Sequence, residues 1–258
     1  MAMEPPAIAV EGVTLGFGDE VVQRDVSFTI RRGEIFVIMG GSGSGKSTLL
    51  RSMIGLLRPK AGQISYEGTP LWTIAGEALA QTQRRFGILF QSGALWSSLT
   101  LAENVGLPLS QYTTLRPPEI AAIVSLKLAL VGLAGFEGYY PSEISGGMKK
   151  RAGLARAIAL DPDILFFDEP SAGLDPLSSK RLDDLILELK DGLGATVVLV
   201  SHELASIMAI ADNAVFLDAE SRTATAHGDP KRLRTGENPK VRDFLTRGRG
   251  LDEGEHPL

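Results

Sequence analysis

The sequence has no cysteine, no excess of positive charge and no long hydrophobic run. Without cysteine, disulfides, thiolate nucleophiles and cysteine-based metal sites are excluded, which suits a cytosolic protein. The 26 Lys and Arg residues against 31 Asp and Glu residues give a formal net charge of −5, which argues against broad, nonspecific binding of nucleic acid. No apolar segment approaches the roughly 20 residues of a membrane-spanning helix. We therefore expect a soluble chain that relies on other chains for any membrane spans.

The N-terminus, Met1–Glu11, lacks a basic segment followed by an apolar one, so we expect no signal peptide. With 258 residues, 44% of them apolar, the chain is long enough for one large α/β domain or a core with a subdomain. This composition argues against global disorder. No internal repeat and no interdomain linker is present in the sequence.

A glycine-rich stretch lies between an apolar run at 35–39 and an apolar-periodic segment at 49–54. Its residues are Gly40, Gly41, Ser42, Gly43, Ser44, Gly45, Lys46, Ser47 and Thr48. In a strand–loop–helix context this pattern indicates a phosphate loop, because glycines let backbone N–H groups approach an anion at a helix N-terminus. Lys46 can then reach the β- and γ-phosphates, and the Ser47 hydroxyl can hold Mg²⁺. A glycine-rich surface turn is the alternative, and the full pattern in this context favours a nucleotide-phosphate site.

Polar side chains follow three further apolar strands. The predicted strand at 86–90 leads into Gln91, the one at 164–167 into Asp168 and Glu169, and the one at 195–200 into His202. Parallel sheets bind ligands at the carboxyl ends of their strands, so we expect these groups to converge with the phosphate loop. A lone Gln or His at a strand end is more often merely solvated, but four such strands in order favour one site.

Hydrolysis of a γ-phosphate needs a metal ion, an oriented water molecule and positive charge. Asp168 is suited to coordinate Mg²⁺, and Glu169 to polarise the attacking water. Gln91 can bridge the metal and the water, and His202 can contact the γ-phosphate. The alternative for 168–170 is a plain strand exit into a turn.

Residues 92–160 are predicted to form an inserted helical subdomain. Pro117 opens a helix with apolar residues at helical spacing, and Ser145, Gly146, Gly147 and Met148 open another at 149–160. Glycines and a serine at a helix start form a second anion site. Since one phosphate loop is already present, this site makes sense if it acts on a nucleotide held by another copy.

The order of these motifs resembles the nucleotide-binding subunit of ABC transporters over about residues 8–230. Gly40–Thr48 resemble its Walker A motif, Gln91 the Q-loop, Ser145–Gly147 the signature, and Ile164–Glu169 Walker B. The D-loop, with Asp175, is matched by 171–175, and the switch histidine by His202. The resemblance implies a P-loop NTPase α/β core with a small N-terminal antiparallel β subdomain and an inserted helical subdomain. It also implies a head-to-tail dimer that sandwiches two ATP molecules with Mg²⁺.

The aromatic Phe17, in the predicted turn 16–19, matches the family's adenine-stacking position, although spacing alone leaves an ordinary turn aromatic equally open. Two residues depart from the usual pattern. Met148 replaces a common Gln in the signature, and Gly41 replaces a common Pro in Walker A, where it should not harm phosphate binding. Met is a good helix former, so simple tolerance also explains Met148.

Three short segments, 90–95, 144–148 and 239–245, resemble the ATPases of Mla/Mce-type lipid transporters. This branch implies a phospholipid-transport ATPase at the cytoplasmic face of the bacterial inner membrane, bound to an integral permease. It also suggests a membrane-anchored Mce-type substrate-binding protein and a small STAS-domain protein as partners, and no nucleic acid. Two alternatives stay open: the ATPase of a small-solute importer, and a soluble ABC protein that acts on nucleic acid or in cofactor assembly.

The predicted organisation is one ABC ATPase domain. Residues 7–91 and 161–230 form its α/β core, 92–160 its helical signature subdomain, and 231–258 a C-terminal extension. We expect a short amphipathic helix at 241–245 and a mobile end from residue 248. Leu95 and Trp96, if exposed, would form a docking patch for the permease.

Overall fold

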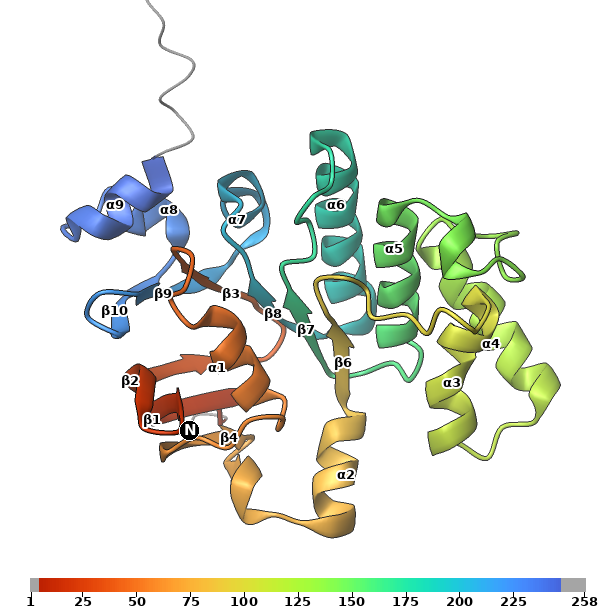
Figure 1. Cartoon of the computed structure of the whole chain (residues 1–258), viewed down its shortest axis with the longest axis horizontal. Coiled ribbons are helices and arrows are strands. Elements are labelled where there is room, and N and C mark those ends of the chain that lie inside the picture. Colours follow the sequence, from red (N-terminus) through yellow and green to blue (C-terminus); the bar gives the residue numbers. More distant parts are fainter. Residues whose placement is uncertain (1–4, 247–258) are drawn as a thin grey trace, which may run out of the picture. The chain divides into compact units, whose positions relative to one another are not determined.

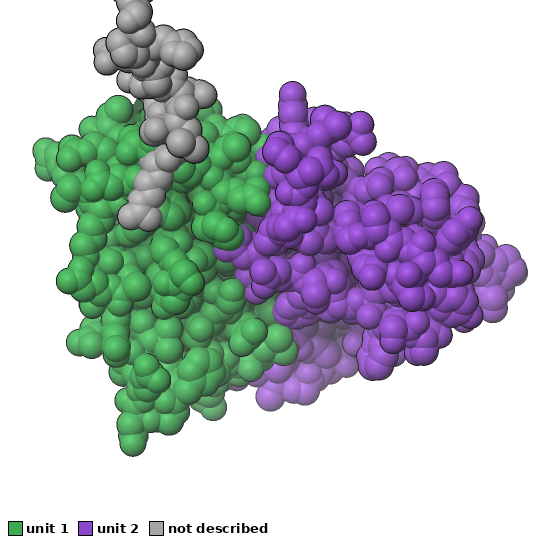
Figure 2. Space-filling model, turned by 45° about the horizontal axis from the view of Figure 1, so that its top comes forward, with its two compact units in different colours: residues 1–72, 200–258 green, residues 73–199 purple. Residues whose placement is uncertain are grey.

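The computed structural model describes residues 5–246, which form two compact units (Figures 1 and 2). Unit 1 contains the chain up to Trp72 and from Val200 onward, and unit 2 contains Thr73–Leu199. The expected helical subdomain, 92–160, lies within unit 2, which also contains strands of the expected core. The predicted boundaries at 92 and 160 therefore remain a prediction. The predicted mobile end at 248–258 lies outside the described residues.

Unit 1 contains an antiparallel sheet with the strand order β2-β1-β4-β5 (Figure 1). Its strands are β1 (Ile8–Phe17), β2 (Glu20–Ile30), β4 (Ala61–Tyr66) and β5 (Thr69–Pro70). This sheet confirms the predicted β subdomain. Residues 8–30, for which the sequence predicts short strands with turns between them, instead form one long hairpin that turns only at Gly18–Asp19, where Gly18 has φ 50°. Phe17 accordingly ends β1 rather than lying in the turn.

The remaining strands of unit 1 are β3 (Ile35–Gly40), β9 (Asn213–Asp218) and β10 (Thr223–Gly228). β3 pairs with β9 in parallel, and β10 pairs with β9 antiparallel. Every residue of β3 is buried, as expected of a strand covered on both faces. Helix α1 (Lys46–Met53) follows β3, and α7 (Leu204–Ile210) and α8 (Pro230–Leu233) lie later in the chain. The rings of Phe28 and Phe36 stack with centroids 5.0 Å apart, which packs β2 against β3.

Helix α9 (Pro239–Thr246) is the predicted helix of the C-terminal extension. Its apolar face is buried, since Val241 and Leu245 are 1% and 4% exposed. Phe244 packs edge-on against Phe216 of β9 at 5.3 Å, and Lys240 Nζ lies 2.9 Å from a carboxylate oxygen of Asp218. This part of the extension therefore belongs to the packed core of unit 1.

Unit 2 contains β6 (Phe86–Leu89), β7 (Ile164–Asp168) and all but the last residue of β8 (Thr196–Val200), in the order β8-β7-β6. β6 and β7 are parallel, with Phe86 opposite Ile164. Helix α2 (Gly76–Arg84) precedes β6, and α6 (Pro176–Leu193) connects β7 to β8. β7 and β8 are buried at every position. β6 ends at Leu89, one residue before the predicted end, because Phe90 and Gly93 form a turn in which the Gly93 N–H donates to the Phe90 carbonyl.

Three helices of unit 2 pack on one another: α3 (Leu101–Tyr112), α4 (Pro117–Leu130) and α5 (Gly146–Ala157) (Figure 1). Thr100 and Glu103 form a capping box at the start of α3, and Pro residues occupy the first turn of α4. Gly106 permits close packing, since a Cβ there would lie 3.4 Å from Ile120 and Val124 of α4. Among the helices between residues 5 and 246, none is long and apolar enough to cross a bilayer.

Candidate nucleotide site and signature helix

The phosphate loop joins β3 to α1, and its geometry requires glycine at two positions. Gly45, the N-cap of α1, has φ 82°, and a Cβ there would lie 2.8 Å from Val22 Cγ1. A Cβ on Gly40 would lie 2.4 Å from the Leu217 carbonyl oxygen. At Gly41, by contrast, nothing lies within 4 Å of an added Cβ. The glycines thus hold the loop against its neighbours, and its backbone N–H groups lie at a helix N-terminus, where anions bind.

Lys46 is the first residue of α1 and is 8% exposed. Its ammonium group donates to the carbonyl oxygens of Gly40 at 3.0 Å and Gly41 at 2.9 Å. The charge therefore lies inside the loop that carries the N–H groups. Ser47 follows in the first turn of the same helix. A positive charge and a hydroxyl group at this position are the donors and ligands that a nucleotide phosphate and its metal ion require.

Gln23 of β2 supports the phosphate loop, although no motif in the sequence points to it. Its side chain is fully buried. Its amide Nε2 donates to the Ser44 carbonyl at 2.8 Å and to the Asp218 carbonyl at 3.2 Å. In the alternating pattern of 20–30, Gln23 resembles any polar strand residue, and only the fold reveals that it faces the loop. It connects the loop to β9 through two buried hydrogen bonds.

Replacing Gln23 with Leu should weaken ATP binding by about tenfold, because the buried Ser44 carbonyl loses its donor at a cost of about 1–3 kcal/mol. Titration of the purified protein with a fluorescent ATP analogue would measure the change in Kd. Gln63→Leu is the matched control, since Gln63 is exposed and its side-chain amide donates to the Glu11 carboxylate at 2.6 Å, away from the phosphate loop. Equal affinities for the two variants would contradict a supporting role for Gln23.

Asp168 and Glu169 are both buried, each 8% exposed. Asp168 ends β7, and Glu169 follows with φ 49°. A positive φ is unfavourable for a residue with a side chain, and such conformations concentrate at functional sites. A plain exit turn would not need a buried, strained carboxylate. This conformation favours the catalytic interpretation of Glu169 over the turn interpretation.

Three further predicted nucleotide residues are exposed. Gln91 and His202 are exposed in the loops that follow β6 and β8, and Phe17 is 53% exposed. Phe17, Lys46, Ser47 and His202 belong to unit 1, whereas Gln91, Asp168 and Glu169 belong to unit 2. The convergence of the four strand ends on one nucleotide remains a prediction.

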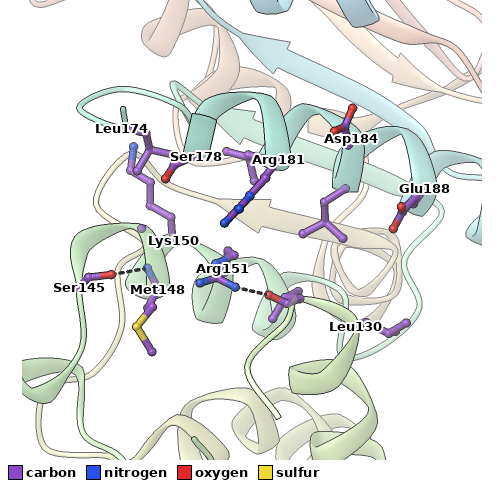
Figure 3. A pocket seen from close by; sticks show the side chains of 14 residues that line it. Leu130, Ser145, Met148, Lys150, Arg151, Leu174, Ser178, Arg181, Asp184 and Glu188 are labelled. Carbon is purple, nitrogen blue, oxygen red and sulfur yellow. Dashed lines mark hydrogen bonds between the residues drawn. The ribbon is translucent and has the colours of Figure 1, made fainter. Parts of the chain in front are cut away.

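The signature residues open α5 as predicted. Ser145 is the N-cap, and its hydroxyl accepts a hydrogen bond from the Met148 N–H at 3.3 Å (Figure 3). Because a hydroxyl group both accepts and donates, this capping bond leaves the Ser145 O–H as a donor. Gly146 and Gly147 begin the helix, so their N–H groups lie at its positive end. Ser145 and Met148 also line a cavity of about 370 Å³ between α5 and α6.

The predicted D-loop connects to both helices around this cavity. The Lys150 ammonium group donates to the Ala172 carbonyl. Asp175 is the N-cap of α6 and accepts from the N–H groups of Leu177 and Ser178. These bonds, led by the one from the Ser178 hydroxyl, lower the pKa of Asp175. Asp175 therefore caps a helix. An Asp directly before a Pro is also typical of a helix start in the sequence.

Magnesium fits the residues expected to hold it. Between residues 5 and 246 there is no group of three or more His, Cys, Asp and Glu side chains that could hold a metal ion. Mg²⁺ does not need such a cage, because it prefers oxygen ligands and commonly binds through one or two carboxylates together with substrate phosphates. The Ser47 hydroxyl, the Asp168 carboxylate and the Gln91 amide oxygen supply ligands of this kind.

Comparisons with known proteins identify the family of the chain. A family model described as ABC transporter matches residues 23–172. The chain is 43% identical over 239 residues to the "Probable ribonucleotide transport ATP-binding protein mkl" of Mycobacterium tuberculosis, covering 93% of this chain and 66% of that protein. It therefore spans just under two thirds of the length of that relative. It is 40% identical over 251 residues to the "Intermembrane phospholipid transport system ATP-binding protein MlaF" of Escherichia coli, covering 97% of this chain and 91% of MlaF.

Solved structures show the same fold. The cassette MJ0796, in a dimeric post-hydrolysis state bound to ADP and Pi, has a TM-score of 0.78 and 28% identity, covering 86% of this chain and 98% of that chain. The cbiO1 protein of Clostridium perfringens, part of the ABC transporter complex cbiONQ, has a TM-score of 0.81 and 26% identity, with coverages of 95% and 96%.

A strand–phosphate loop–helix unit, a strained carboxylate after a buried strand and a glycine-rich signature helix define a P-loop nucleoside triphosphatase of the cassette type. The family model matches more than half of this chain, so the chain belongs to the ABC transporter family. It resembles an ATP-binding subunit of this family over 97% of its length. The predicted family and fold class are thereby confirmed.

Proposed function

We propose that this protein hydrolyses ATP to power phospholipid transport at the bacterial inner membrane. The observation that carries the proposal is the 40% identity to the phospholipid-transport ATP-binding protein MlaF over 97% of this chain and 91% of that protein. Such coverage leaves little of either chain unmatched. The short segments at 90–95, 144–148 and 239–245 support the same branch.

In this proposal each predicted residue has a defined role. Lys46 and the loop N–H groups bind the phosphates, Phe17 stacks on the adenine, and Ser47, Gln91 and Asp168 would hold Mg²⁺. The metal ion, when bound, supplies positive charge to the phosphate oxygens. Glu169 takes the proton of the attacking water, and His202 contacts the γ-phosphate. The buried, strained position of Glu169 supports this assignment, since a base works best where its position is fixed.

A second copy of the chain would complete each site. Ser145, Gly146, Gly147 and Met148 form an anion site separate from the phosphate loop, and Asp175 lies in the connection to α6 beside it. The similar cassette MJ0796 is described as dimeric. We propose that each signature helix binds the ATP held by the other copy, with Ser145 donating its O–H to the γ-phosphate.

The Glu169→Gln variant with ATP should therefore sediment as a dimer, while the nucleotide-free protein should sediment largely as a monomer. Blocked hydrolysis retains the ATP that joins the two copies. Sedimentation velocity measures this directly. Adding Ser145→Arg to the same variant should restore the monomer, because a bulky cation replaces the hydroxyl donor. A stable dimer without nucleotide would show that another surface holds the copies together.

An integral permease would dock beside α2 and α3. There, a groove of about 250 Å³ is lined by Arg84, Phe86, Pro108, Tyr112, Arg156 and Leu160, and the Arg84 guanidinium lies 5.2 Å from the centre of the Tyr112 ring. Trp96, in the loop before α3, is 60% exposed. Its backbone is fixed, because the buried Asn104 side chain accepts from the Trp96 N–H at 2.8 Å and donates to its carbonyl at 3.0 Å. An exposed ring on a fixed loop suits a docking contact.

Replacing Trp96 with Glu should leave ATP affinity unchanged and abolish the stimulation of ATP hydrolysis by the permease. A charge in an apolar contact opposes docking, and Trp is a frequent hot-spot residue. Phosphate release would be compared for the protein alone and with the permease complex in membranes. Leu126→Glu on α4 is the control, since Leu126 is 57% exposed. Full stimulation of Trp96→Glu would contradict this docking surface.

The alternative to this proposal is the ATPase of a small-solute importer, and the two differ in the substrate. The similarity to mkl, which is named for probable ribonucleotide transport, favours the alternative. In a strain that lacks this protein, we expect an altered distribution of phospholipids between the envelope membranes and unchanged uptake of ribonucleotides. A normal lipid distribution with a defect in solute uptake would overturn the lipid assignment and leave the ATPase intact.

The same branch supports the further partners and the location. We propose that the protein lies at the cytoplasmic face of the inner membrane, held there by its permease. A membrane-anchored Mce-type protein and a small STAS-domain protein would complete the complex. The net charge of −5 supports a function without nucleic acid.

A further inference from the structure

The loop that follows Gln91 is held against the signature helix by an arginine. Arg156, in the last turn of α5, donates from Nη1 to the Ala94 carbonyl at 2.8 Å and from Nη2 to the Gly93 carbonyl at 3.0 Å. One planar guanidinium thus binds two successive carbonyl groups through two of its nitrogens, which fixes their relative orientation. Burial lowers the pKa of the Arg156 guanidinium, as expected for a charge enclosed between a helix and a loop.

The same loop is also fixed against α5 by close backbone packing. A Cβ on Gly153 would lie 2.9 Å from the Gly93 carbonyl oxygen and 3.1 Å from Gly93 Cα, and one on Gly93 would lie 3.0 Å from the Lys149 carbonyl oxygen. The loop therefore touches α5 without intervening side chains. Gly93 and Ala94 have φ 76° and 47°, and such a conformation persists at Ala94 only when its surroundings enforce it.

We propose that Arg156 is a positioning residue for Gln91: by binding the carbonyls of Gly93 and Ala94, it fixes the loop on which Gln91 meets its nucleotide. This rests on the role proposed above for Gln91. Gln91 lies in the turn 90–93, which is closed by a hydrogen bond from the Gly93 N–H to the Phe90 carbonyl at 2.8 Å. Arg156 therefore binds the residue that closes this turn. A displaced Gly93 displaces Gln91.

The same contact connects the two proposed functions of this region. Ser145, which would act on the ATP of the second copy, caps the N-terminus of α5, and Arg156 lies near its C-terminus. The loop of Gln91, which would act on the ATP of its own copy, is therefore attached to the helix that carries the signature. Displacement of either one is transmitted to the other through Arg156.

A double-mutant cycle on kcat for ATP hydrolysis tests the inference. Arg156→Gln should lower kcat by about fivefold or more, and combining it with Gln91→Ala should lower kcat no further than Gln91→Ala alone, because both changes remove one interaction. Arg151→Gln is the matched control. Arg151 lies on the same helix and donates to two carbonyls, those of Val131 at 2.9 Å and Gly132 at 3.1 Å, so its effect on kcat should multiply with that of Gln91→Ala.

Gly153→Ala provides an independent variant that retains Arg156. Alanine favours a helix over glycine, yet the added Cβ must displace Gly93, so kcat should fall and the fall should again not add to that of Gln91→Ala. This variant decides the test if Arg156→Gln does not fold. Multiplicative effects of Arg156→Gln or Gly153→Ala with Gln91→Ala would overturn the positioning role alone. An unchanged kcat in Gln91→Ala would instead overturn the role proposed for Gln91, and the inference with it.

Discussion

Replacing Glu169 with Gln should lower kcat for ATP hydrolysis by about 10²–10⁴-fold, the usual contribution of a general base. The amide retains the size of the carboxylate and one of its acceptor oxygens but cannot accept the proton of the attacking water. It also retains the strain of φ 49°, because both side chains branch alike beyond Cβ. ATP affinity should therefore stay close to that of the wild type. Phosphate release from the permease-bound complex measures kcat, and nucleotide titration measures affinity.

The exposed Glu237, in the segment between α8 and α9, provides the control, since Glu237→Gln makes the same chemical change on the surface. Its kcat should equal that of the wild type. If Glu169→Gln released phosphate at nearly the normal rate, the role of base would belong to another residue. A large loss of ATP affinity in Glu169→Gln would indicate instead that the carboxylate acts in binding.

Replacing Lys46 with Ala should weaken ATP binding by about 10- to 150-fold, because charge-assisted hydrogen bonds contribute about 1.5–3 kcal/mol each. The effect differs in kind from that of Glu169→Gln, since it appears in the Kd for ATP before any chemistry. Titration with ATP and with AMP separates binding of the β- and γ-phosphates from binding of the rest of the nucleotide, because AMP lacks the two phosphates that Lys46 would contact. The loss should therefore be large for ATP and small for AMP.

Lys46 also donates to the carbonyls of Gly40 and Gly41, so its removal can loosen the loop. A melting curve of Lys46→Ala distinguishes this effect, because a loosened loop lowers Tm whereas a lost phosphate contact does not. Lys231→Ala, at an exposed lysine of α8, is the control for a lost charge. Equal losses of affinity for ATP and AMP would contradict a contact between Lys46 and the terminal phosphates.

Much of the fold follows from local sequence patterns. The buried strands at 35–40, 164–168 and 196–200 consist mainly of apolar runs, which are typical of a parallel sheet covered on both faces. Helix α9 follows from its apolar spacing. The error at 8–30 arose in part because Gly16 resembles a turn residue, whereas in the structure it lies within β1, next to a register shift in its pairing with β2.

The site is harder to predict where a residue acts through the fold. Lys46, Glu169 and Ser145 belong to contiguous motifs, so the sequence reveals them. Gln23 contacts Ser44 across 21 positions, and Arg156 contacts Gly93 across 63. An arginine in the last turn of a helix is already explained by the helix dipole, so nothing in the sequence alone points to its loop contact. Such pairs emerge only when strands and helices are packed.

The most direct test of the account is phospholipid transfer by the purified complex with its permease, reconstituted in vesicles with ATP and Mg²⁺. The wild-type protein should move fluorescent phospholipid only when ATP is hydrolysed, and the complex with Glu169→Gln should not move it, although it binds ATP. Phospholipid transfer at the same rate in both complexes, or no transfer by a wild-type complex that hydrolyses ATP, would contradict the proposed function.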